Sequence, residues 1–261
     1  MTSCRMPAVA GVFYPEDATE LRQQVQRYLS QATPPPCSPK ALIVPHAGYV
    51  YSGAVAASAY ASLATIADQI HRIALFGPAH RVALRGLAIS AASAFETPLG
   101  SVPVDAEMRD QLRRFPQVQV SDDPHRLEHS LEVQLPFLQM LLKQFTLVPL
   151  VVGDATAEEV CSVMDYLWQQ PGTLIVVSSD LSHYHNYQHA RQLDQQTSDA
   201  IEQLQPDSIS YEQACGRNPV NGLLLLAQQR QLQATTVDLR NSGDTAGSRD
   251  RVVGYGAYIF H

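Results

Sequence analysis

Short apolar runs alternate with helical patterns along most of the chain. Runs at 41–44, 73–76, 147–152 and 174–177 contain almost no polar residue, and residues with helical spacing follow several of them. Strands that are apolar on both faces are typical of sheets covered by helices on both sides. The pattern therefore predicts one α/β domain over residues 1–261, with a central, mostly parallel or mixed sheet covered by helices.

Polar residues at the ends of these runs predict where several helices begin. Asp17 and Asp105 stand where an N-cap is expected, and Ser130 is expected to open a further helix. Pro136 falls inside that helix, so it should either kink the helix or delay its start. Further predicted elements are a strand at 87–90 followed by a loop to 104, helices at 54–64, 157–169, 188–204 and 220–231, and closing strands at 235–239 and 252–260.

Composition narrows the function classes. The 261 residues carry a net charge of −7, with only two lysines and no basic run, which argues against nucleic-acid binding. No apolar run is long enough to cross a bilayer, and the N-terminus lacks the apolar stretch of a secretory signal. The four cysteines show no paired spacing. We therefore expect a cytoplasmic protein with reduced thiols; its oligomeric state stays open.

Three of the predicted strands end in turns that contain histidine. His46 follows the strand at 41–44, His80 follows the strand at 73–76, and Asp180 and His183 follow the strand at 174–177. Ligands of open α/β sheets bind at the carboxyl ends of the strands. If the strands are parallel neighbours, these four side chains converge at one edge of the sheet. This convergence is the strongest functional prediction that the residues alone provide, against the alternative of ordinary loop histidines.

The residue types suit a metal site but leave its composition open. Two histidines and a carboxylate suit Fe(II), whereas histidine with cysteine suits zinc or a softer metal. Cys215 precedes a Gly-containing turn and a helix, so it reads either as a buried thiol or as a thiolate stabilised by a helix N-terminus. His129 and Glu132 would share one helix face, as acid–base or supporting groups or simply as a charged helix start.

Five ordered motifs together resemble the Memo family, also called AmmeMemoRadiSam system protein B. They are Pro45-His-Ala-Gly-Tyr-Val-Tyr-Ser-Gly53, Gly77-Pro-Ala-His80, Glu128-His-Ser-Leu-Glu-Val-Gln-Leu-Pro136, Val177-Ser-Ser-Asp-Leu-Ser-His183 and Cys215-Gly-Arg-Asn-Pro219. The resemblance spans nearly the whole chain. It implies a fold similar to class III extradiol dioxygenases and a metal bound by His46, His80 and Cys215. It also implies that Asp180, His183 and His129 line the same cleft.

Two functions compete on this basis. The first is a metal-dependent redox enzyme that holds Fe(II), or alternatively copper or zinc, with His183, His129, Asp180 and Glu132 as candidate catalytic groups. The second is a non-catalytic protein whose cleft captures an anionic peptide or small ligand through Arg217, with Tyr49 as a further ligand-binding candidate. The family's system implies radical-SAM and AMMECR-type partners. A zinc hydrolase is a third, lesser reading.

Overall fold

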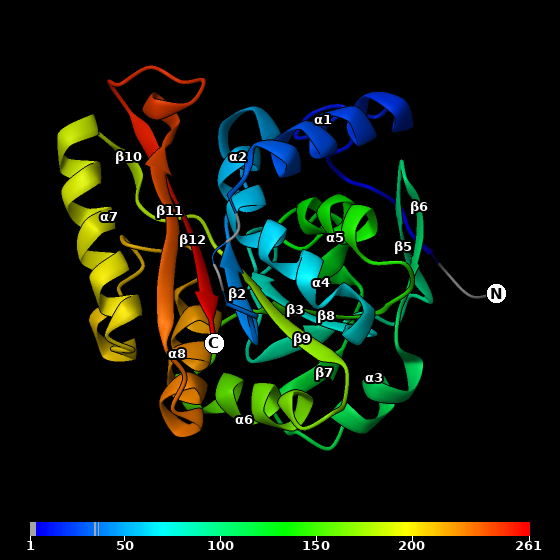
Figure 1. The fold of residues 1–261 in the computed structure, drawn as a ribbon. Coiled ribbons are helices and arrows are strands. Elements are labelled where there is room, and N and C mark those ends of the chain that lie inside the picture. Colours follow the sequence, from blue (N-terminus) through cyan, green and yellow to red (C-terminus); the bar gives the residue numbers. More distant parts are fainter. Residues whose placement is uncertain (1–3, 34, 36) are drawn as a thin grey trace.

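The computed structural model describes residues 4–33, 35 and 37–261. Within them a nine-stranded sheet runs in the order β10-β12-β2-β9-β3-β8-β4-β7, with β11 paired to β12 beside this path (Figure 1). Its strands are β2 (Ala41–Val44), β3 (Arg72–Pro78), β4 (Leu87–Ile89), β7 (Val118–Val120), β8 (Thr146–Val152), β9 (Thr173–Ser178), β10 (His183–His185), β11 (Ala234–Asn241) and β12 (Val252–Phe260).

The helices predicted at 157–169, 188–204 and 220–231 are found within three residues of those bounds, but the helix predicted at 54–64 begins at Tyr49, and Asp123–Arg126 forms a short helix that the pattern does not predict. The helices are α1 (Ala18–Gln31), α2 (Tyr49–Tyr60), α3 (Ala106–Leu112), α4 (Asp123–Arg126), α5 (Leu135–Leu141), α6 (Ala157–Trp168), α7 (Tyr187–Glu202) and α8 (Arg217–Arg230), with short 3₁₀ turns η1 (Ala61–Thr65), η2 (Ala67–Gln69), η3 (Glu132–Gln134), η4 (Pro206–Ser208) and η5 (Ser242–Asp244). Asp17 and Asp105 cap α1 and α3 as predicted, because their side chains accept backbone N–H groups of the first turn.

The sheet is mixed, with a parallel centre. β2, β9, β3 and β8 are mutually parallel, whereas β4 and β12 run antiparallel to their neighbours β8 and β2. Alternate residues of β2 face opposite layers: Leu42 and Val44 pack with α1, α2 and α5, and Ala41 and Ile43 pack with α3, α6 and α8. Both faces are therefore covered, which explains why these strands are continuous apolar runs (Figure 1).

A small second sheet replaces part of the predicted loop between 90 and 104. β5 (Ala94–Thr97) and β6 (Gly100–Pro103) form an antiparallel hairpin, and β1 (Cys4–Arg5) pairs parallel to β5. Gly100 adopts a φ of +120° in the turn, a conformation that favours glycine. The segment was predicted as a loop because strands of four residues give too short an alternating pattern to recognise.

The helix expected from Ser130 begins later. Residues Glu132–Gln134 form η3, and α5 starts at Leu135 with Pro136 in its first turn. A proline is tolerated there because the N–H groups of the first turn have no partner within the helix. The proline thus delays the helix, one of the two outcomes predicted, and residues 127–131 remain outside any helix.

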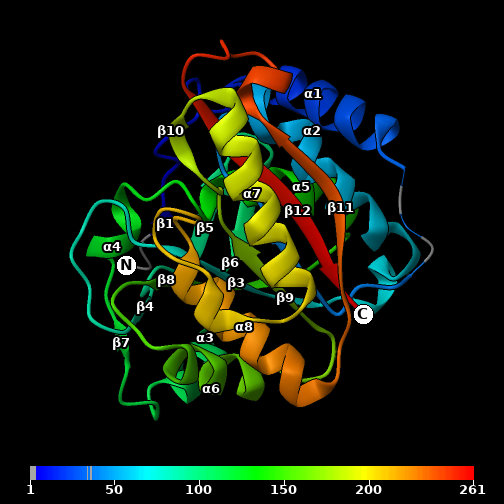
Figure 2. The same cartoon turned by 90° about the vertical axis from the view of Figure 1, so that its left-hand side faces the viewer.

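At the β11 side of the sheet, α7 packs against β11 and β12 (Figure 2). None of the helices described is long and apolar enough to span a membrane. At the carboxyl ends of β2, β3 and β9, the three histidine-bearing turns emerge side by side, because the strands are parallel neighbours.

Candidate metal centre

The turns after β2 and β3 bring two histidines together, and a third arrives from the segment before η3. The ring centroids of His46 and His80 lie 5.1 Å apart, and those of His129 lie 5.4 Å from His46 and 4.9 Å from His80. His46 is buried, the His129 side chain is 14% exposed, and His80, at 27%, is the most exposed of the three. Three imidazoles therefore share one site at the edge of the sheet.

Cys215 completes this site from the opposite end of the chain. Its Sγ lies 3.3 Å from Nε2 of His46, and the ligand atoms of His46, His80 and Cys215 all lie within 4.8 Å of one another. The turn before α8 is held against β9, where the Gly216 N–H donates to Oγ of Ser179 at 3.0 Å. A side chain at Gly216 would meet Ser179 at 2.7 Å, so this close approach requires glycine.

Hydrogen bonds fix which nitrogen His46 presents to the site. Ser178 Oγ donates to the carbonyl of Ser130 at 2.6 Å and accepts from the Gln134 amide at 2.8 Å. The one proton of the Ser178 hydroxyl is already donated to Ser130. The hydroxyl oxygen therefore accepts a hydrogen bond from Nδ1 of His46 at 2.9 Å. Nδ1 of His46 therefore carries the proton, and the lone pair of Nε2 faces Cys215.

Glu128 has the same role for His80. Its carboxylate accepts from Nδ1 of His80 at 2.9 Å and from the N–H groups of His80, His129 and Ser130 at 2.7–3.0 Å. Burial alone would raise the pKa of Glu128, but the bonds from His80 outweigh it and lower the pKa to about 2. A carboxylate that holds a histidine through Nδ1 is a common supporting contact at metal sites, and it leaves Nε2 free for the ion.

Asp180 supports the site from the turn after β9. Its Oδ1 accepts the N–H of His46 at 2.7 Å, and its Oδ2 lies 3.9 Å from Nε2 of the same histidine. Burial raises the pKa of Asp180 above its ordinary range. The carboxylate is thus close enough to orient His46 or to approach an ion bound there.

The electrostatics of the site favour the neutral forms of His46, His129 and Cys215. Burial, with the neighbouring His80 and His129, holds the pKa of His46 well below its usual range, and burial also lowers the pKa of His129. Burial and the adjacent Asp180 raise the pKa of the Cys215 thiol. Neutral imidazoles are the form that binds metals, and a bound cation would favour the thiolate.

These residues fit a metal ion. A ring nitrogen of His46, a ring nitrogen of His80 and the sulfur of Cys215 converge. Both histidines have Nδ1 engaged in a hydrogen bond, and Nδ1 of His129 is buried without one. A donor set of two imidazoles and a thiolate suits zinc, copper or iron.

The candidate metal centre opens into a hollow of about 710 Å³. Asp180, His129 and His183 line it. His185, on the other side of Tyr184, is not among the lining residues and meets the His189 ring edge-on, with the ring centroids 4.7 Å apart. The remaining lining comes from Val12, Phe13, Ala47, Gly48, Tyr51, Arg81, Tyr184, Ser242, Gly247, Ser248, Arg251, Val253 and Tyr255.

Three residues expected at the site lie elsewhere. Glu132 is fully buried in an ion pair with Arg5, and it accepts from the hydroxyl of Tyr14 and from N–H groups of the N-terminal segment. The helix-face argument failed for Glu132 because η3 begins only there, so His129 and Glu132 do not share a helix. Its neighbour Glu128, which the same motif contains, supports the site instead.

The two ligand-binding candidates are also corrected. The Tyr49 ring is buried in the core, and its hydroxyl donates to the carbonyl of Val133 at 2.6 Å. Two residues further along α2, Tyr51 lines the hollow. The Arg217 guanidinium stacks over the Tyr211 ring at 3.8 Å, outside the lining residues. Sequence alone could not choose between neighbouring residues of one type.

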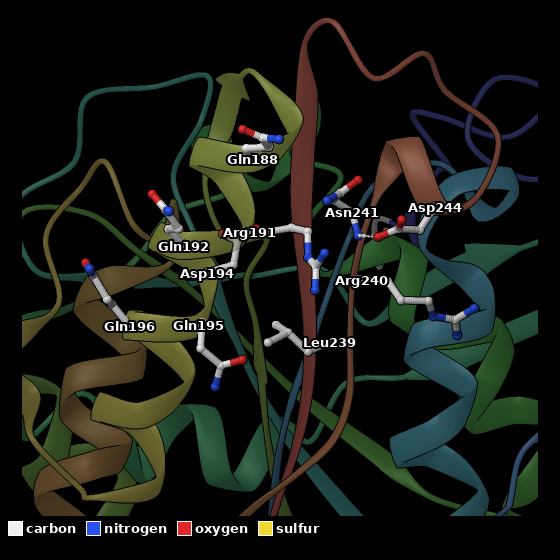
Figure 3. Close-up of a pocket in the computed structure, with 10 residues that line it drawn as sticks. All are labelled: Gln188, Arg191, Gln192, Asp194, Gln195, Gln196, Leu239, Arg240, Asn241 and Asp244. Atoms are coloured by element: carbon white, nitrogen blue, oxygen red, sulfur yellow. Dashed lines mark hydrogen bonds between the residues drawn. The ribbon is translucent and has the colours of Figure 1, made fainter.

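A second large hollow, of about 800 Å³, lies between α7 and β11 (Figure 3). Its lining is mostly polar and contains none of the three clustered histidines. The residues are Gln188, Arg191, Gln192, Asp194, Gln195, Gln196, Leu239, Arg240, Asn241 and Asp244.

Comparisons with known proteins agree with the motifs. The model of the Memo-like protein family matches residues 5–259. A MEMO1 family protein of Methanosarcina acetivorans is 36% identical and one of Aquifex aeolicus is 34% identical, and each match covers 98% of both chains. The crystal structure of uncharacterized protein JW3007 from Escherichia coli K12 has a TM-score of 0.50 at 14% identity, covers 82% of this chain and 98% of its own, and shows a similar fold. The chain belongs to the Memo-like protein family.

Proposed function

We propose that the protein is a metal-dependent redox enzyme in which His46, His80 and Cys215 hold an iron or copper ion. The observation that supports this proposal is that one ring nitrogen from each of His46 and His80 and the Sγ of Cys215 all lie within 4.8 Å of one another. Both histidines have their other nitrogen fixed, by Ser178 and by Glu128. When bound, such an ion supplies a Lewis acid and a one-electron centre.

The residues around the centre have chemistry beyond metal binding. His129 and His183 line the hollow without belonging to the proposed ligand set, and burial favours the neutral form of His129. A neutral imidazole can accept a proton from a bound substrate and return it. Asp180 holds His46 through its backbone N–H and keeps a carboxylate beside the reacting side of the ring.

The test is metal analysis of protein purified anaerobically, as isolated and after reconstitution with Fe(II), Cu(I) or Zn(II). We expect about one bound ion in the wild type and a loss of that ion in His46→Ala, His80→Ala and Cys215→Ser. His185→Ala and Cys4→Ser are the matched controls, because His185 lies outside the hollow and Cys4 is exposed. Turnover that persists without metal would refute the redox proposal, and bound zinc would favour a hydrolase.

A second candidate is a non-catalytic binding protein that uses the same cleft. The size of the hollow, about 710 Å³, favours it, because pockets of this volume accommodate small ligands or peptide side chains. In this case a radical-SAM or AMMECR-type partner would bind equally well to wild type and to His46→Ala/His80→Ala. A partner whose binding depends on both histidines would instead link binding to the metal centre.

A further inference from the structure

Two arginines at the hollow have no acidic partner. Arg81 and Arg251 both line it and are exposed, and no ion pair involves either of them among the described residues. The positive charge of Arg81 also helps to lower the pKa of His129. In a chain of net charge −7, two guanidinium groups without an ion pair beside the histidine cluster are a local feature that favours anions.

The loop before β12 holds Arg251 in this position. Arg249, two residues earlier, stacks over the Tyr187 ring at 4.4 Å and lies 3.9 Å from Asp244, whose carboxylate also accepts the Tyr187 hydroxyl at 2.5 Å. The loop closes on itself where the Gly247 N–H donates to the carbonyl of Ser242 at 2.7 Å. Arg249 therefore anchors the loop to α7, while Arg251 lines the hollow.

Aromatic and apolar side chains surround the same opening. Tyr184 is 63% exposed, Tyr51 is 38% exposed and Val12 is 78% exposed. Tyr184 has a φ of +61° beside an irregularity in the β10–β12 pairing, and Arg251 lies 5.3 Å above its ring. A non-glycine residue rarely adopts this conformation, and such residues often occur at functional sites. The opening thus combines cations with aromatic walls.

The charged groups of the lining limit the charge of the ligand. Besides histidines and tyrosines, Arg81, Arg251 and Asp180 are the titratable residues that line the hollow. Two guanidinium groups against one carboxylate leave one net positive charge on the residues that line the hollow. The Glu128 carboxylate lies behind this lining, where His80, His129 and Ser130 donate four hydrogen bonds to it. Arginine binds carboxylates through paired N–H donors, and its face stacks on aromatic rings.

We infer that the cleft selects a monoanionic carboxylate carried on an aromatic body. The carboxylate binds at Arg81 and Arg251, and the aromatic body contacts the Tyr51 and Tyr184 side of the opening. As an assignment of substrate class this inference rests on the proposed function, but the binding preference itself does not require a metal.

The experiment measures binding of phenylacetate, its neutral analogue phenylacetamide, acetate and phenyl phosphate by calorimetry or ligand-observed NMR. We expect phenylacetate to bind at least about tenfold more tightly than phenylacetamide or acetate. Arg81→Gln and Arg251→Gln should each weaken phenylacetate about tenfold and leave phenylacetamide unchanged. Arg217→Gln is the matched control, because Arg217 stacks on a tyrosine as Arg251 does but outside the hollow.

Three results would overturn the inference: equal binding of phenylacetate and phenylacetamide, equal losses in Arg217→Gln and Arg251→Gln, or tighter binding of phenyl phosphate. The same titrations on Cys215→Ser separate this inference from the metal proposal. A preference for phenylacetate in wild type that binds no metal would refute the metal centre and support the anion site. Wild type that binds a metal ion but does not prefer phenylacetate would support the metal centre and refute the anion site.

Discussion

Replacing Asp194 by asparagine should change how stability depends on pH. Asp194 projects from α7 at the wall of the second hollow (Figure 3). Its Oδ1 accepts the N–H of Ser182 at 3.0 Å. The same carboxylate packs against Gly254, so closely that a Cβ there would lie 2.1 Å from Oδ2. Only 3% of the residue is exposed, and burial raises its pKa from 3.8 to about 6.

The direction in which stability changes with pH follows from proton binding to Asp194. Between about pH 4 and pH 6 the folded protein holds a proton on Asp194 that the unfolded chain has released, so this group makes the free energy of unfolding fall as pH rises. A pKa change of about 2 corresponds to about 3 kcal/mol. Asparagine cannot ionise and can still accept from Ser182. Asp194→Asn should therefore match wild type near pH 4 and exceed it by up to about 3 kcal/mol at pH 7.5.

The assay is urea unfolding at pH 4.5, 5.5, 6.5 and 7.5 with excess EDTA, followed by the fluorescence of the single tryptophan, Trp168. The difference in the free energy of unfolding between variant and wild type at each pH removes the contribution of the buried histidines, because both proteins contain them. Asp199→Asn is the control, because Asp199 is an exposed carboxylate on the same helix. A difference that stays constant across the pH range, or a variant less stable than wild type at pH 7.5, would refute the reasoning.

Three further substitutions probe the candidate centre and its surroundings. Glu128→Gln should lower metal affinity roughly 10–100-fold in a competition titration, because the histidine it holds loses a charged acceptor; unchanged affinity would count against that support. Gly216→Ala places a Cβ 2.7 Å from Ser179, so it should cost about 1–3 kcal/mol of stability and reduce bound metal. Glu132→Gln leaves Arg5 without its buried charged partner and should lower the free energy of unfolding in urea by about 3–5 kcal/mol, while the amount of bound metal stays unchanged. A variant that loses metal without losing stability would show that Glu132 does act at the metal site.

The sequence by itself determined the layers of the fold. The four apolar runs became β2, β3, β8 and β9 within one or two residues, because a strand buried on both faces tolerates almost no polar side chain. Local chemistry also fixed the caps of α1 and α3, and it limited Pro136 to a kink or a delayed start of α5, of which the structure shows the delayed start. The sequence pattern did not predict the hairpin at 94–103, because its strands are too short to show a recognisable alternation of apolar and polar residues.

Part of the site followed from the same logic. Chain direction places the residue after each parallel strand at one edge of the sheet, so His46, His80 and Asp180 could be expected together without knowledge of any contact. The structure places all three on the lining of one hollow. Cys215 could not be assigned this way, because the residues alone fitted a buried thiol equally well; only the family resemblance indicated it.

Tertiary structure decided the rest. Cys215 reaches His46 across 169 positions of sequence, a contact that depends on the whole path of the chain. The choices of Glu128 over Glu132, and of Tyr51 over Tyr49, depended on where a helix begins and which side of it faces the core. These are questions of packing between distant segments, which local pattern does not encode.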